Sequence, residues 1–172
     1  GYVVYRRRFL GVPLREVSKA PPAFGPALAL EYRRLVVPVI AGQPSDDAMD
    51  VACRLAAERG SRIVALSIVE VSLDRHLTET EPELEAQANR ELDEAVAIAD
   101  SYGIRVVGRL ERARSAGQAI VAEAEARDAE IIVIGSPRRR LTSYQAAVFG
   151  KTVDYVLKHA PCRVLVTASE AS

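Results

Sequence analysis

Apolar and polar residues alternate along the chain in blocks of two kinds. Short runs rich in valine and isoleucine predict buried strands at residues 35–40, 62–71, 105–113, 131–136 and 163–168. Between them, apolar residues recur at helical spacing over residues 45–60, 83–102, 115–129 and 150–160. Strands that are apolar throughout need both faces covered, so the alternation predicts an α/β fold with helices on both faces of a parallel sheet.

The first 31 residues do not follow this pattern. They open with GYVVYRRRFLGVPLREV, an apolar, tyrosine-bearing stub followed by three arginines, and continue through the proline-rich segment KAPPAFGP. Such an opening is typical of the cytoplasmic end of a membrane helix, and equally of a solvated basic tail. We therefore expect an N-terminal juxtamembrane extension and linker over residues 1–31 and one folded domain over residues 32–172.

Composition narrows the classes of function. The chain has 172 residues, of which 49% are hydrophobic and 27% charged, and this describes one globular domain with a substantial core. Its 23 basic and 23 acidic residues give no net charge, which argues against a nucleic-acid-binding protein. The two cysteines and two histidines lack the spacing of zinc ligands, so no metal site is expected.

The segment IIVIGSPRRRLTSYQAAVFGKT, residues 131–152, has the features of a phosphate site. A strand ends at Gly135, a loop with three arginines follows, and the next helix is predicted to open at Gly150, Lys151 and Thr152. Free backbone N–H groups at a helix start attract phosphate. The helix predicted from Ser45 begins with two aspartates, which would repel it.

From Tyr32 to Ala168 the chain resembles the universal stress protein family. The resemblance rests on the opening LVVPV, on the glycine-serine pair followed by a long loop and a second glycine, and on VLKHAPCRVLV at residues 156–166. It implies a three-layer fold with a five-stranded parallel sheet of order 3-2-1-4-5. Many members of the family bind ATP or another adenine nucleotide, whereas others bind none. In a sheet of this order a crevice opens between strands 1 and 4.

We expect the adenine ring over an apolar edge formed by Pro38, Val39 and Ile68, and the phosphates near Gly135 and the last helix. The family's ATP pattern is matched only in part. Arg138 replaces the second glycine, Gly150 matches the third with two extra residues in the spacing, Lys151 takes the serine position, and Ile40 replaces the aspartate that follows VPV. A site for ATP, ADP, AMP or a cyclic nucleotide and an empty crevice are both compatible with this sequence.

The N-terminal stub also resembles the junction in amino acid–polyamine–organocation permeases, in which a universal stress domain follows the last membrane helix. This resemblance implies a regulatory domain of a membrane amino acid transporter, at the cytoplasmic face of the plasma membrane and joined to the membrane domain of the same polypeptide.

Two other functions compete with this interpretation. No catalytic triad or carboxylate pair is recognisable, so we expect no enzyme, with weak ATP hydrolysis as an alternative. The last strand would lie at the sheet edge, and family members commonly dimerise through it, so we expect a homodimer through Arg163–Ala168. A ligand-free dimerisation or scaffold module would use this edge alone.

Overall fold

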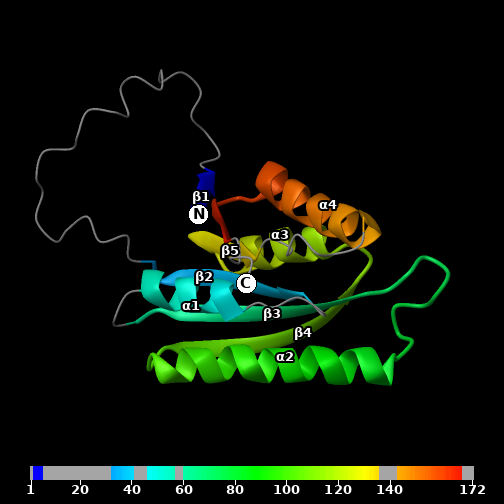
Figure 1. The fold of residues 1–172 in the computed structure, drawn as a ribbon, viewed down its shortest axis with the longest axis horizontal. Coiled ribbons are helices and arrows are strands. Elements are labelled where there is room, and N and C mark those ends of the chain that lie inside the picture. The colour runs from blue at the N-terminus through cyan, green and yellow to red at the C-terminus, as the bar shows by residue number, and fades with distance from the viewer. Residues whose placement is uncertain (1, 6–31, 41–45, 57–59, 136–142, 168–172) are drawn as a thin grey trace, which may run out of the picture.

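The computed structural model describes residues 2–5, 32–40, 46–56, 60–135 and 143–167 (Figure 1). Within these ranges the chain forms one sheet and four helices. The strands are β1 (Tyr2–Tyr5), β2 (Arg34–Ile40), β3 (Arg62–Glu70), β4 (Arg105–Ala113), β5 (Ile131–Gly135) and β6 (Arg163–Thr167). The helices are α1 (Asp46–Leu55), α2 (Pro82–Ser101), α3 (Ala116–Ala126) and α4 (Ser143–His159).

The sheet has the strand order β1-β6-β5-β2-β3-β4. Its five parallel strands are the five that the sequence predicts, and their order corresponds to 3-2-1-4-5, so the expected fold class is confirmed. Winding starts at β2, proceeds to β3 and β4, and then returns to the other side of β2 for β5 and β6. The switch point of the fold therefore lies between β2 and β5.

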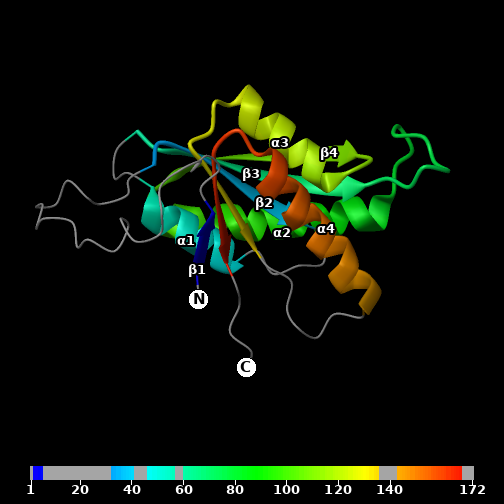
Figure 2. The same ribbon diagram turned by 90° about the horizontal axis from the view of Figure 1, so that it is seen from above.

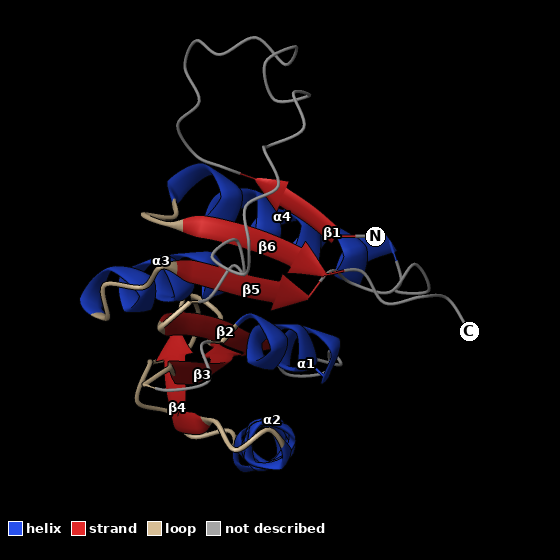
Figure 3. Ribbon diagram, turned by 90° about the vertical axis from the view of Figure 1, so that its left-hand side faces the viewer, coloured by secondary structure: helices blue, strands red, loops and turns tan. Residues whose placement is uncertain are grey.

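Helices cover both faces of the sheet, α1 and α2 on one and α3 and α4 on the other (Figures 1 and 3). The first layer buries Met49, Ala52 and Ala95 against the odd-numbered residues of β2, such as Val37. The second buries Ile120 and other residues of α3 and α4 against the opposite side of the sheet. β2 and β5 contribute to both layers because their side chains alternate between the faces.

The start of the last helix differs from the prediction. α4 begins at Ser143, not at Gly150, so the expected long loop is shorter and Gly150 lies inside the helix. Glycine is a poor residue for a helix interior, which made it a natural place to expect a helix start. Here it is exposed, and apart from its chain neighbours and the backbone of its own helix no described atom lies within 4 Å of where its Cβ would be.

β1 is the second departure from the prediction. Tyr2–Tyr5 pairs antiparallel with β6, from Tyr2 opposite Thr167 to Tyr5 opposite Val164. The expectation that β6 forms the sheet edge was therefore wrong, because a strand of the extension takes up its outer backbone groups (Figure 2). No helix among the described residues is both long and apolar enough to cross a bilayer.

Candidate functional site

The sheet opens at its switch point. β2 pairs with β5 only through Leu35 with Ile131 and Val36 with Ile132. Beyond these pairs β2 continues along β3 as far as Ile40, and β5 continues along β6 to Gly135. Pro38, which has no N–H to donate to a ladder, lies just past the last pair. The carboxyl ends of the two strands therefore separate where an α/β sheet normally receives its ligand.

The structure divides the residues expected to support an adenine ring. Val39 is fully buried in the layer of α1 and α2, whereas Ile68 is 2% exposed and belongs to the layer of α3 and α4. These two side chains point to opposite faces of the sheet, so they do not form one apolar edge. Pro38 is buried as well. Any contact of these three residues with a nucleotide stays a prediction.

The residues expected to hold phosphate lie along α4. Lys151 is exposed and Thr152 is buried, and both follow Gly150 inside the helix. Backbone amides in a helix interior are normally used by the carbonyl four residues earlier, so the free amides belong to the turn that begins at Ser143. That first turn contains no acidic residue, so the electrostatic preference for phosphate applies at Ser143.

Two predicted site residues lie wholly or partly outside the described residues. Arg138 lies outside the described residues, as do the neighbouring arginines 139 and 140. Ile40 is part of β2 and pairs with Ile68, but its side chain is outside the description. Gly135 ends β5, is half-buried and lies opposite Thr167 of β6.

Thr167 is a candidate that the sequence analysis missed. Its side-chain oxygen Oγ1 is buried and has no hydrogen-bond partner among the described residues. Burying a hydroxyl without a partner costs free energy, so such groups are rare and often mark a place where a ligand or water binds. The sequence signal that could have identified it is a threonine at the end of the predicted strand 163–168, next to the strand that ends at Gly135.

The two cysteines lie in environments that disfavour the thiolate form. Burial raises the pKa of Cys53 to about 11, with a smaller contribution from Asp50. Burial also raises the pKa of Cys162 to about 11, although a hydrogen bond with the backbone of Ile132 lowers this pKa to a smaller extent. Both pKa values lie well above neutral pH, so both thiols are protonated there. No cluster of three or more metal-ligating side chains occurs in these ranges.

The fold and the separated strands define a class of protein: a doubly wound α/β domain with a ligand crevice at its switch point. Residues 31–168 match the universal stress protein family. The chain belongs to this family. No curated protein matches the chain.

Solved structures of universal stress proteins share this fold. A universal stress protein from Archaeoglobus fulgidus is 23% identical, with a TM-score of 0.61 over 78% of this chain and 98% of that one. The A. fulgidus protein in complex with dAMP is 24% identical, with a TM-score of 0.60 over 78% and 97% of the two chains. A universal stress protein in complex with cAMP is 20% identical, with a TM-score of 0.62 over 81% and 99%.

Proposed function

We propose that this domain binds an adenine nucleotide at the carboxyl ends of β2 and β5. The observation that carries the proposal is the short ladder between these strands, which pair through only two residues each before they separate. Solved family members hold dAMP and cAMP, which supports the ligand class. ATP, ADP, AMP and cyclic nucleotides are the candidates.

The proposed site uses backbone groups and one orphaned hydroxyl. Gly135 lets phosphate approach the end of β5 closely because it has no side chain. Thr167 Oγ1, opposite Gly135 in the register, is available to donate a hydrogen bond. Lys151, exposed on α4, supplies positive charge without an acidic partner among the described residues.

Calorimetric titration with ATP, ADP, AMP, cyclic AMP and cyclic di-AMP tests this proposal. At least one nucleotide should bind, and Gly135→Val should weaken its binding by about tenfold or more, because a side chain would hold phosphate away from the backbone. Lys151→Ala should weaken binding too.

Lys158→Ala, which removes the same charge from the last turn of α4, is the matched control and should leave the affinity unchanged. Absence of heat with all five ligands would leave the scaffold function instead.

We further propose that the domain binds the nucleotide without turning it over. No cluster of metal-ligating side chains occurs in the described ranges, and no catalytic triad or carboxylate pair is recognisable in the sequence, which supports this. Incubation with ATP should release no inorganic phosphate above the buffer rate. Sustained release that Lys151→Ala abolishes would establish the weak ATPase.

The regulatory role in an amino acid transporter is also a proposal, with the domain at the cytoplasmic face of the plasma membrane. It rests on the apolar stub and the basic cluster of residues 1–8, and on their resemblance to a permease junction. Reading the gene upstream of Gly1 tests it. A frame that encodes successive hydrophobic spans is expected, and a start codon near Tyr32 with no spans before it would remove the transporter.

A homodimer through Arg163–Ala168 remains the proposed assembly, with one added requirement. β1 occupies the outer side of β6, so a second copy can pair there only if β1 is displaced. Displacement of β1 by a second copy is compatible with both the nucleotide-binding function and the scaffold function.

A further inference from the structure

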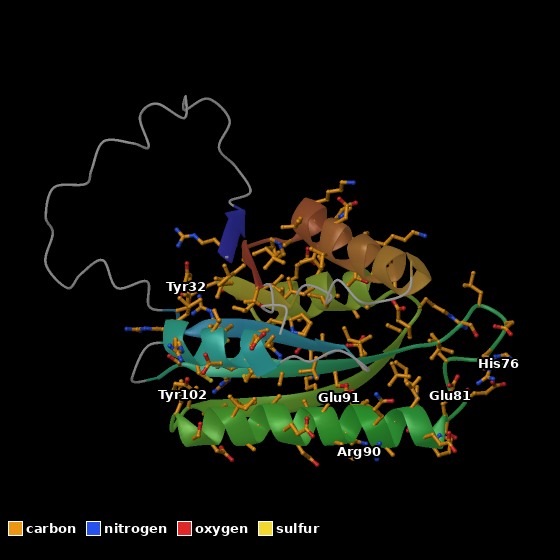
Figure 4. All side chains as sticks on the ribbon, in the orientation of Figure 1. Tyr32, His76, Glu81, Arg90, Glu91 and Tyr102 are labelled. Carbon is orange, nitrogen blue, oxygen red and sulfur yellow. The ribbon has the colours of Figure 1, made fainter. Side chains whose placement is uncertain are left out.

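The amino-terminal edge of the sheet is strongly basic. Arginine is the first residue of four of the five parallel strands: Arg34 in β2, Arg62 in β3, Arg105 in β4 and Arg163 in β6. The register places Arg62 beside Arg34 on one side and beside Arg105 on the other. Because parallel strands start at the same edge, these arginines gather at the end of the sheet marked by Tyr32 and Tyr102 (Figure 4). This edge is opposite the proposed nucleotide crevice.

Part of this positive charge is neutralised within the fold. Glu130 accepts hydrogen bonds from the backbone amides of Arg33 at 2.6 Å and Arg34 at 3.1 Å, and its other oxygen lies 3.4 Å from the Arg34 guanidinium. Arg34 Nε also donates to the carbonyl of Asp128 at 2.6 Å. Arg163 donates to the hydroxyl of Tyr32 at 2.9 Å. The carboxylate of Glu130 is therefore already occupied by Arg33 and Arg34.

A cavity of about 240 Å³ opens between these residues. Four arginines line it, and its remaining described lining consists of apolar side chains and a glycine, without an acid: Arg33, Arg34, Arg62, Arg127, Leu35, Val36, Val64, Gly60 and Ala129. Val36 and Val64 are at most 2% exposed and both belong to the layer of α3 and α4, so they form an apolar floor on that side of the sheet.

Two of the four arginines form no close ion pair in the described chain, although the charge of Arg33 also acts on Glu130. Arg34 pairs with Glu130, and Arg127 pairs with Glu123 at 2.9 Å. The guanidinium groups of Arg33 and Arg62 form no ion pair with any described residue. A concave, partly apolar wall strengthens the electrostatic attraction of such groups for an anion, because it keeps part of the high-dielectric solvent away.

We propose that this cavity, the amino-edge cavity, binds a phosphate group through Arg33 and Arg62. The planar fork of arginine matches the oxygens of phosphate, and two such forks can hold one group from two sides. The cavity is smaller than the roughly 300–1,000 Å³ of pockets for drug-sized ligands, so it suits a phosphate group better than a whole nucleotide. The group can belong to a soluble phosphate ester or to the headgroup of an anionic phospholipid.

The proposal is independent of nucleotide binding at the crevice and is tested separately from it. Inorganic phosphate is titrated into the labelled chain at low ionic strength, while the amide signals of Gly60 and Arg62 at the cavity and of Gly135 at the crevice are followed. The Gly60 and Arg62 signals should shift with saturation. Shifts confined to Gly135, or linear shifts without saturation, would overturn the proposal.

Charge-removing variants identify the residues that bind. Arg62→Gln and Arg33→Gln should each weaken phosphate binding by about tenfold. Arg90→Gln is the matched control, because Arg90 is exposed on α2, outside the cavity, and forms no ion pair with a described residue (Figure 4). An equal loss in all three variants would mean unspecific attraction by net charge and would contradict the site. Thermal unfolding of each variant confirms that it is folded.

Sedimentation with vesicles distinguishes the two sources of the phosphate group. Binding to vesicles of phosphatidylcholine with phosphatidylglycerol, but not to phosphatidylcholine alone, and its loss in Arg62→Gln but not in Arg90→Gln, would assign the cavity to lipid headgroups. Phosphate saturation without vesicle binding would assign it to soluble esters. Failure of both experiments would refute the proposal.

Discussion

Glu130 connects two segments that lie far apart in the sequence. Its carboxylate accepts from the amides at the start of β2, and β5 follows it directly. Burial by itself would raise the pKa of Glu130. The amide hydrogen bonds of Arg33 and Arg34 and the charge of Arg34 outweigh that effect and hold the pKa below its ordinary value of 4.5. The carboxylate form therefore stabilises the fold.

This arrangement predicts a pH dependence of stability. A depressed pKa in the folded state means that the stabilisation is present above pH 4.5 and is lost as the pH falls through the folded pKa. Glu130→Gln should lower the free energy of unfolding near neutral pH by about 1 kcal/mol, a value reduced for partial exposure. Urea titrations near neutral pH and at about pH 3 should show a smaller difference in acid. Glu125→Gln, on the exposed side of α3, is the control, and an equal effect there would contradict the prediction.

A substitution at Thr167 is expected to raise the stability of the fold, in contrast to Glu130→Gln. Thr167→Val removes a buried hydroxyl that lacks a partner among the described residues, so it should raise the free energy of unfolding by about 1 kcal/mol. Thr152→Val provides the comparison, because Thr152 is also buried but is not without a partner, and this variant should be destabilised. Chemical denaturation measures both. If Thr167→Val also weakens nucleotide binding, its hydroxyl contacts the ligand; destabilisation of Thr167→Val would mean that the hydroxyl has a partner after all.

At the scale of elements, the contact between α3 and α4 depends on a glycine. A Cβ at Gly117 would lie 2.9 Å from the Tyr155 side chain, closer than packed atoms allow. The ring of Tyr155 also stacks on His159, with centroids 4.0 Å apart, which restricts its movement. The two helices can therefore approach closely only where α3 has no side chain.

Two alanine substitutions test this contact. Gly117→Ala should destabilise the fold by about 1–3 kcal/mol through overpacking. Gly150→Ala, also in a helix but with open space around its Cβ in the described structure, should stabilise it by roughly 0.5–1 kcal/mol. Thermal and urea unfolding of Gly117→Ala and Gly150→Ala measure these changes in the free energy of unfolding. Equal shifts in the same direction would show that Tyr155 moves aside freely.

Element type was predictable where burial alone fixes it. β2, β3 and β5 are predominantly apolar, and strands of this kind are stable between two helical layers. The start of α4 was not predictable from Gly150, because an exposed glycine is tolerated in a helix whose other residues favour it. The splitting of Val39 and Ile68 between two faces depends on the register of β2 and β3, which one sequence does not specify. Tyr2–Tyr5 has strand-forming residues, but its partner lies at the other end of the chain.

At the scale of the whole molecule, β1 controls access to the edge of β6. Deleting residues 1–5 should expose the outer backbone groups of β6 and shift the chain from monomer toward dimer, because unpaired edge strands associate. Light scattering coupled to size exclusion measures the change. Replacing Tyr2–Tyr5 with Gly-Ser-Gly-Ser should have the same effect, since it removes the strand without shortening the chain. Two monomeric variants would argue against a dimer at this edge.

The antiparallel pairing of β1 with β6 also brings together residues that are 165 positions apart in the sequence, because Tyr2 lies opposite Thr167. A circular permutant can therefore be made with a short linker between Thr167 and Tyr2 and new termini beside Leu73, which is 89% exposed between β3 and α2. This permutant should keep every strand neighbour of the sheet. Its far-ultraviolet circular dichroism should match that of the parent chain, and a random-coil spectrum would mean that the pairing of these two strands does not persist in solution.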